Sequence, residues 1–402
     1  MTSHGIRDKV AIIGMGCTRF GELWDRGTSD LLVEAATDSV KSAGVTFDDI
    51  DAFWLGTMDS GYSGLTLSTA IKVHGKPVTR VENLCATGSE ALRGAVYAVA
   101  SGAIDMAMAI GVEKLKDSGY SGIVRNDPPD DGTAPETTAP AAFSYLAPAY
   151  QAAHDLDDAT IREALTHIAV KNHANGARNE RAQFRSPVSA DKVNSSPLVA
   201  GTLGILDCSG VADGAAAAIV VRAEDAYRYS DRPMFVKALS VVAGDGQAML
   251  DDDASYASIP EAASSAANAY AEAGITDPRH EVSLAEVHDC FTPTELVLME
   301  DLGFSPRGQA YQDVLEGVFD ANGQLPVNID GGLKSFGHPI GATGLRMAFE
   351  CWQQFRGEAG ERQLPDPRIG LTHNLGGRPG RCVSFVGIFG KSPSGAQRST
   401  TS

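Results

Sequence analysis

The sequence predicts an α/β protein made of two similar halves with a long segment inserted between them. Short apolar runs that end at glycine, such as residues 9–14 (KVAIIG) and 104–111 (IDMAMAIG), alternate with stretches of helical spacing. Such runs are typical of strands covered on both faces, and their alternation with helices favours parallel sheets. The same succession of elements also occurs twice along the chain, which indicates an internal duplication.

In the first half, strands and helices follow one another in regular order. Asp30 lies in the first turn of the first predicted helix, and Gly44 is placed to end it. The predicted elements are a strand at 9–14, a helix at 29–43, a strand at 49–56, a helix at 91–100 that starts just after Cys85, and a strand at 104–111.

The second half repeats this order. Gly14 and Gly244 are 230 residues apart, and so are Gly44 and Gly274. The further matches are 282–287 with the strand near residue 53, 342–344 (ATG) with 86–88 (ATG), and 369–375 with 104–110. One such match can arise by chance, but an ordered series favours duplication.

These repeats divide the chain into a first half at 1–230 and a second half at 231–392. Residues 113–205 fit neither repeat and are predicted to form an inserted loop domain, with a helix at 159–183. A long insertion in a two-part enzyme is commonly a lid or a substrate-binding element. Residues 393–402 are polar, and we expect a disordered tail there.

Composition excludes several classes of partner. The 402 residues are 43% hydrophobic and 21% charged, with a net charge of −18. An ordinary globular protein of this charge is not expected to bind nucleic acid or an anionic membrane surface. The apolar run at 94–112 contains Asp105 and several glycines, so it is read as a helix followed by a strand and not as a membrane span.

Cysteine usage points to a reducing compartment. The six cysteines are widely spaced and form no CxxC pair, so neither a zinc ribbon nor a disulfide scaffold is indicated. Residues 1–14 hold no apolar signal core. A cytoplasmic location with reduced thiols is the simplest interpretation.

Cys85 is the first candidate for chemistry. It lies in the segment 81–90 (VENLCATGSE), where a polar turn leads into a helix of small and apolar residues. Unpaired backbone N–H groups and the helix dipole at such a terminus favour an anion, so we expect a thiolate near neutral pH. The alternative is a buried cysteine with no chemical role.

Three segments at predicted strand ends carry further candidates. They are 286–291 (EVHDCF), 337–344 (GHPIGATG) and 373–377 (HNLGG). The carboxyl ends of strands are where sites form in open α/β sheets. His338, between a glycine and a proline, is held on a stiff turn, which suits a base. His373 is interpreted as an ordinary buried histidine.

These motifs resemble those of the thiolase superfamily. Cys85 in NLCATGSEA, His338 in GHPIGATG, 328–332 (NIDGG) and 207–217 (DCSGVADGAAA) all match, and the resemblance extends over residues 8–390. It implies a five-layered α-β-α-β-α fold. Many thiolases carry a cysteine in the late glycine-rich segment, where this chain has Asn374. With Cys290 in HDCF instead, it is similar to sterol-carrier-type thiolases and their archaeal relatives.

The resemblance implies a role for each matching residue. Cys85 is the nucleophile that becomes acylated, and His338 takes its proton. Cys290 removes or returns a proton at the α-carbon of a second acyl-CoA. His288, together with His338, holds the enolate oxygen, and the backbone N–H groups of Cys85 and Gly376 form a second oxyanion hole. A weakly acidic α-proton needs such a base and such donors.

Coenzyme A thioesters are then the substrates, and the resemblance implies no metal or redox cofactor. The CoA phosphates need a basic region in this acidic chain. Residues 171–192 supply one, and we hypothesise that Arg178, Arg181 and Arg185 lie near the phosphates. A solvated basic helix face is the alternative.

The expected activity is that of an acetyl-CoA C-acetyltransferase. It condenses two acetyl-CoA to acetoacetyl-CoA, or cleaves a 3-oxoacyl-CoA. A 3-ketoacyl synthase, a lipid-transfer-type retro-aldolase and a non-enzymatic acyl-CoA carrier are the alternatives. Cys290 argues against the first, Cys85 against the second, and the full set of reactive residues against the third. The resemblance further suggests a homodimer, a small OB-fold zinc-ribbon partner protein, and a hydroxymethylglutaryl-CoA synthase as partner in the mevalonate pathway.

Overall fold

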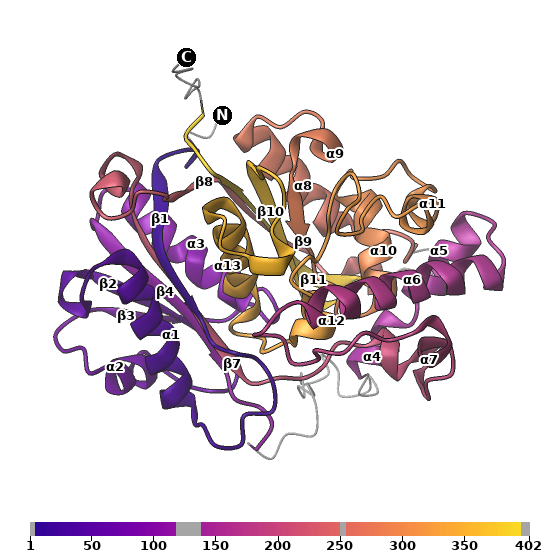
Figure 1. Cartoon of the computed structure of the whole chain (residues 1–402), viewed down its shortest axis with the longest axis horizontal. Coiled ribbons are helices and arrows are strands. Elements are labelled where there is room, and N and C mark those ends of the chain that lie inside the picture. The colour runs from indigo at the N-terminus through magenta and orange to yellow at the C-terminus, as the bar shows by residue number, and fades with distance from the viewer. Residues whose placement is uncertain (1–4, 118–137, 250–254, 395–402) are drawn as a thin grey trace.

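The computed structural model describes residues 5–117, 138–249 and 255–394. Nine strands form one sheet in the order β3-β2-β4-β7-β1-β8-β11-β10-β9, and β5 and β6 form a separate pair (Figure 1). The strands are β1 (Val10–Cys17), β2 (Ala52–Gly56), β3 (Val78–Val81), β4 (Met106–Glu113), β5 (Leu198–Ala200), β6 (Leu203–Gly204), β7 (Gly214–Arg222), β8 (Met234–Ala243), β9 (Leu284–Glu286), β10 (Ile369–Arg378) and β11 (Arg381–Gly390).

The helices lie on both faces of this sheet and in the insertion. Among the described residues no helix has both the length and the apolar character needed to cross a bilayer. The helices are α1 (Thr28–Ala43), α2 (Leu65–Ile71), α3 (Thr87–Ala100), α4 (Ala139–Phe143), α5 (Leu146–Ala153), α6 (Asp158–Ala177), α7 (Ala190–Asn194), α8 (Pro260–Ala273), α9 (Pro278–Glu281), α10 (Thr292–Asp301), α11 (Ala310–Leu315), α12 (Gly332–Phe336) and α13 (Thr343–Arg356).

The sheet and helices stack as the five layers that the sequence predicts. α1 and α2 cover one side of the first-half strands, α3 and α13 lie between the two halves, and α8 covers the outer side of the second-half strands (Figure 1). Successive side chains of β1 pack on opposite faces of the sheet. Ala11 and Ile13 belong to the hydrophobic cluster under α1, whereas Val10 and Ile12 belong to the central cluster. Each face of the strand is therefore buried, which explains its continuous apolar sequence.

The predicted duplication is confirmed by strand order. β2-β4-β7-β1 in the first half corresponds to β9-β10-β11-β8 in the second, with the same sense of pairing at each step. Gly44 and Gly274 end α1 and α8 in the left-handed conformation, at φ of 68° and 73°. A Cβ on Gly14 would lie 2.6 Å from the Cβ of Ala43, so this glycine lets α1 pack directly on β1.

The prediction of parallel sheets is wrong for part of each half. β7 pairs antiparallel with both β4 and β1, and β11 pairs antiparallel with β10 and β8. In the second half a turn at Pro379 and Gly380 (φ 83°) joins β10 to β11 as a hairpin. A hairpin needs no crossover helix, and an apolar run alone does not reveal strand direction.

The predicted insertion helix ends earlier than expected. α6 stops at Ala177 and not at 183. Beyond it the backbone N–H groups of Gln183 and Phe184 donate to the carbonyls of Phe336 and Ser335 in α12, at 3.0 and 2.9 Å. The chain here follows α12 instead of continuing the helix, because these tertiary bonds replace helical ones.

At the chain's end, residues 395–402 of the predicted tail lie outside the described residues. Ser394 is described, and its backbone N–H donates to Asp8 at 2.9 Å. The boundary between the halves at residue 230 stays a prediction.

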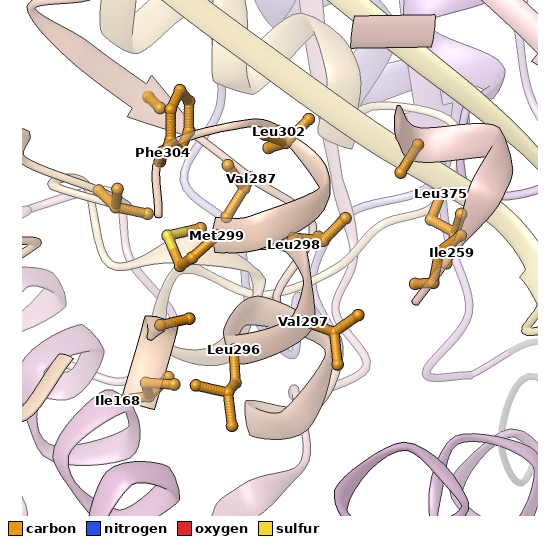
Figure 2. Close-up of a cluster of buried hydrophobic side chains, with 14 of the residues drawn as sticks. Ile168, Ile259, Val287, Leu296, Val297, Leu298, Met299, Leu302, Phe304 and Leu375 are labelled. Carbon is orange, nitrogen blue, oxygen red and sulfur yellow. The ribbon is translucent and has the colours of Figure 1, made fainter. Parts of the chain in front are cut away.

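α10 is buried on all sides and anchors the segment before it. Figure 2 shows Leu296, Val297, Leu298 and Met299 pointing outward from this helix in different directions. They pack in one cluster with Ile168 and Ile259, from α6 and the segment before α8, and with Leu375 from β10. Each such side chain contributes roughly 1.5–3 kcal/mol on full burial. The 288–291 segment that leads into α10 is thereby held in place.

Candidate active site

Cys85 lies in a tight turn between β3 and α3. The preceding residue, Leu84, has φ of +50°, a conformation that side-chain-bearing residues rarely adopt. Backbone bonds from Ala86 to Asn83 and from Thr87 to Leu84, both of 3.0 Å, close the turn. Strain of this kind persists only where the surroundings impose it, and it clusters at functional sites.

Cys85 meets two histidines from distant segments. Its sulfur and one ring nitrogen each of His288 and His338 all lie within 4.8 Å of one another. The two imidazole rings meet edge to face, with centroids 5.4 Å apart and an interplanar angle of 83°. Both histidines are buried, whereas Cys85 is half-buried. The fold therefore brings together the segments after β3, after β9 and before α13.

Cys290 lies close enough to this cluster for its thiol to interact electrostatically with Cys85. It is 6% exposed, and its sulfur lies 3.6 Å from the hydroxyl of Thr294. Burial raises the pKa of its thiol well above the usual value, and the charge of Cys85 adds to that rise. The segment that returns from the insertion also reaches this point, because the N–H of Ser209 donates to the Cys290 carbonyl at 2.8 Å.

His338 is held in one orientation and one tautomer. The Thr343 hydroxyl donates to the carbonyl of Pro339 at 3.0 Å, so it accepts from Nδ1–H of His338, at 2.8 Å. Nε2 then carries the lone pair, and it has no hydrogen-bond partner among the described residues. The ring thus presents an unpaired basic nitrogen inside the cluster. Thr343 was not singled out from the sequence, where it marked only the start of a helix.

The resting protonation states follow from burial. It lowers the pKa of His338 to about 3 and that of His288 well below the usual value, and the charge of Arg346 adds to both effects. Burial also raises the pKa of Cys85 to about 12, with further rises from Glu82 and Glu113. The site at rest holds a neutral thiol beside neutral imidazoles.

The sequence-based expectation of a Cys85 thiolate is therefore wrong. The first residue of α3 is Thr87, and Ala86 occupies the cap position between it and the cysteine. Backbone hydrogen bonds to the sulfur from Gly377 and from Cys85 itself lower the pKa, but desolvation outweighs them. Removal of the thiol proton thus needs a base.

The two glycines at the end of β10 face the Cys85 turn. A Cβ on Gly376 would lie 2.4 Å from the Asn83 carbonyl oxygen, so only glycine fits there. Gly377, with φ of 101°, supplies the N–H that reaches the sulfur. The role of Gly376 in an oxyanion hole stays a prediction, and Gly377 is an addition that sequence reasoning missed. The GG doublet in HNLGG was the available signal.

Asn374 and His373 point to opposite faces of β10. The Asn374 side-chain oxygen accepts from the Ser89 hydroxyl at 2.6 Å, at the start of α3. His373 is paired with Ser384 at 3.1 Å, and Ser384 in turn contacts Ser265 of α8. His373 is fully buried on the side of β10 that faces α8, as expected of an ordinary buried histidine.

The His288 segment is fastened by the residue that follows it. The carboxylate of Asp289 accepts from the N–H groups of Leu333 and Lys334, at 2.6 and 3.2 Å, and from Asn172 of α6 at 2.8 Å. Asn328 adds a bond from the Val287 N–H at 2.8 Å. The site is therefore tied to both the insertion and α12, through motif side chains that had no predicted role.

Beneath the histidines lies a fully buried ion cluster. Arg346 of α13 contacts Glu286 at 3.1 Å and Asp330 at 2.5 Å, and none of the three side chains is exposed. The guanidinium also lies over the ring of Phe336, 5.1 Å from its centroid. Glu286 is two residues before His288, so this cluster fixes the strand end that carries the histidine.

The three arginines proposed for CoA have different surroundings. Arg178 bonds Asn175 of its own helix at 2.6 Å, and Arg181 lies over the ring of Phe349, 5.6 Å from its centroid. Arg185 is exposed. Their contact with CoA stays a prediction, and the first two have structural partners that the sequence did not reveal.

The sequence of this chain matches two protein-family models and several known proteins. Residues 10–224 match the family described as "Thiolase, N-terminal domain", and residues 246–386 match "Thiolase C-terminal domain-like". The acetyl-CoA acetyltransferase of Methanothermobacter thermautotrophicus is 39% identical over 396 residues, which cover 95% of this chain and 99% of the relative. Human sterol carrier protein 2 is 32% identical over 392 residues, covering 92% of this chain and 70% of the relative.

Two solved structures share the fold. The aldolase in "Ltp2-ChsH2(DUF35) aldolase" aligns with a TM-score of 0.83 at 24% identity, over 97% of this chain and 99% of that one. Human mitochondrial 3-ketoacyl-CoA thiolase aligns with a TM-score of 0.70 at 17% identity, over 96% and 99%. With both halves matched and near full-length relatives at this identity, the chain belongs to the thiolase family.

Proposed function

We propose that this protein is an acetyl-CoA C-acetyltransferase that works through an acetyl group carried on Cys85. The observation that carries the proposal is the unpaired Nε2 of His338 beside the half-buried Cys85 thiol, with His288 in the same cluster and Cys290 near enough to interact electrostatically with Cys85. The 39% identity to an archaeal acetyl-CoA acetyltransferase over nearly the whole chain supports the same activity.

In the first step, His338 removes the thiol proton of Cys85 as the sulfur attacks the thioester carbonyl. Proton removal and attack must be coupled, because the separated ion pair is strongly disfavoured by burial. We propose that backbone N–H groups near Gly376 and Gly377 stabilise the oxyanion. CoA leaves as a thiolate, takes the proton back from His338 and departs as the free thiol. The products are acetyl-Cys85 and a neutral His338, with Cys290 still a neutral thiol.

In the second step, Cys290 passes its thiol proton to His338 as its sulfur removes the α-proton of a second acetyl-CoA. The protonated His338, together with an N–H of His288, faces the enolate oxygen as a donor. The enolate carbon attacks the acetyl carbonyl on Cys85, and the carbon–sulfur bond breaks. The Cys85 thiolate recovers the proton from His338, and acetoacetyl-CoA is released. The reverse order is thiolysis, in which the neutral Cys290 thiol donates its proton to the leaving enolate.

The test is to incubate the protein with isotope-labelled acetyl-CoA and analyse peptides by mass spectrometry. An acetyl group on the peptide that contains Cys85, absent from Cys85→Ala, is expected. Thiolysis of 3-oxoacyl-CoA substrates of increasing length then defines chain preference.

The same experiment separates the alternatives. A lipid-transfer-type retro-aldolase cleaves its substrate without an acyl-cysteine, and a 3-ketoacyl synthase makes the carbon–carbon bond only from a malonyl-type donor that loses CO2. An unlabelled Cys85, or product formed only from such a donor, would reject the proposed activity.

CoA is proposed to enter along the insertion. Residues 208–211 pass between Cys290 and His338, because Ser209 bonds the former and the Gly210 carbonyl accepts from the backbone N–H of the latter at 3.0 Å. Exposed Arg185 and Lys192 lie on the same inserted domain and are the cations available to phosphate groups.

The assembly is also a proposal. β3 is the edge strand of the sheet, and near it Tyr62 and Leu65 are 94% and 72% exposed, which supports a homodimer through this surface. A small DUF35-type partner is proposed from the solved aldolase complex. A cytoplasmic role in mevalonate synthesis is proposed from the motif resemblance alone. Light scattering at several protein concentrations tests the homodimer. Co-purification of a small partner with the untagged protein tests the DUF35-type complex.

A further inference from the structure

We propose that Cys85, His288 and His338 form a binding site for Zn²⁺ and that the bound ion switches the nucleophile off. Thiolate sulfur and imidazole nitrogen are the donors that Zn²⁺ prefers. These three side chains offer one sulfur and two nitrogens, all within 4.8 Å of one another. The binding is independent of the proposed function, and only its inhibitory effect rests on the role of Cys85.

The distances suit a zinc ion after a small adjustment. Zn–S bonds are about 2.3 Å and Zn–N bonds about 2.0–2.1 Å, so donor atoms around a tetrahedral ion are roughly 3.5 Å apart. Side-chain rotations of about 1 Å bring the cluster to that spacing. Cys85 is half-buried and not fully enclosed, and the proposed fourth ligand is a water.

The histidines are already prepared as ligands. His338 Nε2 and His288 Nδ1 are both buried without a hydrogen-bond partner among the described residues. The contact with Thr343 fixes the tautomer that leaves Nε2 of His338 unprotonated, as second-layer hydrogen bonds do in zinc proteins. Neutral imidazoles need not lose a proton to bind, so only the thiol exchanges one.

Electrostatics favours a cation at the sulfur. Glu82 and Glu113 both act on Cys85, and the negative charge that disfavours a lone thiolate favours a metal-bound one. The positive charge of Arg346 disfavours a cation near the histidines, but this arginine is paired with Glu286 and Asp330. Binding replaces the S–H bond by a Zn–S bond and releases one proton to solvent, so charge and atoms balance.

The experiment measures zinc binding by competition with a chromogenic chelator, using the full chain freed of metal and kept reduced with a phosphine. One ion per chain with a Kd in the micromolar range or tighter is expected, with release of about one proton. Cys85→Ser and His288→Asn should each weaken binding by about 10- to 100-fold. Cys208→Ser, a half-buried cysteine outside the cluster, and His280→Gln, an exposed histidine, should bind normally.

A second measurement avoids mutation. Alkylation of Cys85 by iodoacetamide, followed on its own peptide, should be suppressed by stoichiometric Zn²⁺ and restored by a chelator. Absence of one-to-one binding at 100-fold excess over the chain, or binding that Cys85→Ser and His288→Asn leave unchanged, would overturn the proposal. Zinc binding by a protein that shows no acetyl-Cys85 would instead reject the proposed function and keep the metal site.

Discussion

The hydroxyl of Ser89 donates a 2.6 Å hydrogen bond to the side-chain oxygen of Asn374. This bond joins the start of α3 to β10 at the position where many thiolases carry a cysteine. The amide is further placed by a 3.3 Å contact with the sulfur of Met347. An amide cannot remove an α-proton, so the second sulfur of the proposed reaction has to come from Cys290, on a different strand end.

Replacement of Cys290 by Ala should separate the two half-reactions. Cys85 keeps its base, so it should still be acetylated by acetyl-CoA. Exchange of the α-protons of acetyl-CoA with deuterated solvent should fall by about 10²- to 10⁴-fold, because a positioned base contributes that much. Peptide mass spectrometry and NMR follow the two reactions.

Cys351→Ala is the control, since that cysteine is also fully buried but packs against Gly370. It should leave both reactions intact apart from some loss of stability. Normal exchange in Cys290→Ala would assign the proton transfer to another group.

A methyl group at Gly376 should disable the site without unfolding the protein. The added Cβ would lie 2.4 Å from the Asn83 carbonyl, so the Cys85 turn has to move. A misplacement of about 1 Å can reduce kcat by about 10²-fold. Gly27→Ala is the control, because its nearest neighbour is 3.7 Å away and its φ is ordinary. Unchanged kcat in Gly376→Ala would show that the turn has freedom the structure does not indicate.

The reactivity of Cys85 toward iodoacetamide should report its raised pKa. Only the thiolate reacts, and below the pKa its fraction rises tenfold per pH unit, so alkylation should increase by about 100-fold from pH 7 to pH 9. A pKa of about 12 places the plateau beyond this range. The rate is read on the Cys85 peptide, since Cys208 is also half-buried and reacts separately. A plateau between pH 6 and pH 8 would instead restore the resting thiolate expected from the sequence.

These outcomes show which features the sequence could predict. Glycine is needed where the backbone has a positive φ or where two segments pack closely. Gly44 and Gly274 end corresponding helices and Gly14 lies against α1, so these glycines indicated both repeats correctly. The reactive motifs, too, were recognisable as short strings at strand ends, and the fold brings Cys85, His288 and His338 together as expected.

Features set by tertiary context were not predictable. The direction of β7 and β11 depends on connections that an apolar run does not encode. The protonation state of Cys85 depends on how strongly the folded protein desolvates its thiol. The position of the Arg181 side chain depends on the nearby ring of Phe349. Thr343 was visible in the sequence, but its bond to His338 depends on a turn closed in three dimensions.

Loss of the Arg346 charge should destabilise the protein strongly. Arg346→Met leaves Glu286 and Asp330 facing each other without a cation, and removing one partner of a buried ion pair typically lowers the free energy of unfolding by about 3–5 kcal/mol. Urea denaturation at pH 7 measures the effect. Arg222→Met is the control: this arginine pairs with the exposed Asp105, where solvent screens the interaction, so little change is expected.

The stability lost in Arg346→Met should be restored when Glu286 and Asp330 are also made neutral. Burial already raises the pKa of Glu286 well above the usual value. A neutral replacement of both acids, in Arg346→Met with Glu286→Gln and Asp330→Asn, should therefore recover most of the lost stability. Recovery of folding without recovery of kcat would identify Arg346 as a positioning residue, because its charge adds to the burial that lowers the pKa of His288 and His338. A triple variant as unstable as Arg346→Met alone would mean that the guanidinium acts through its packing on Phe336 and not through its charge.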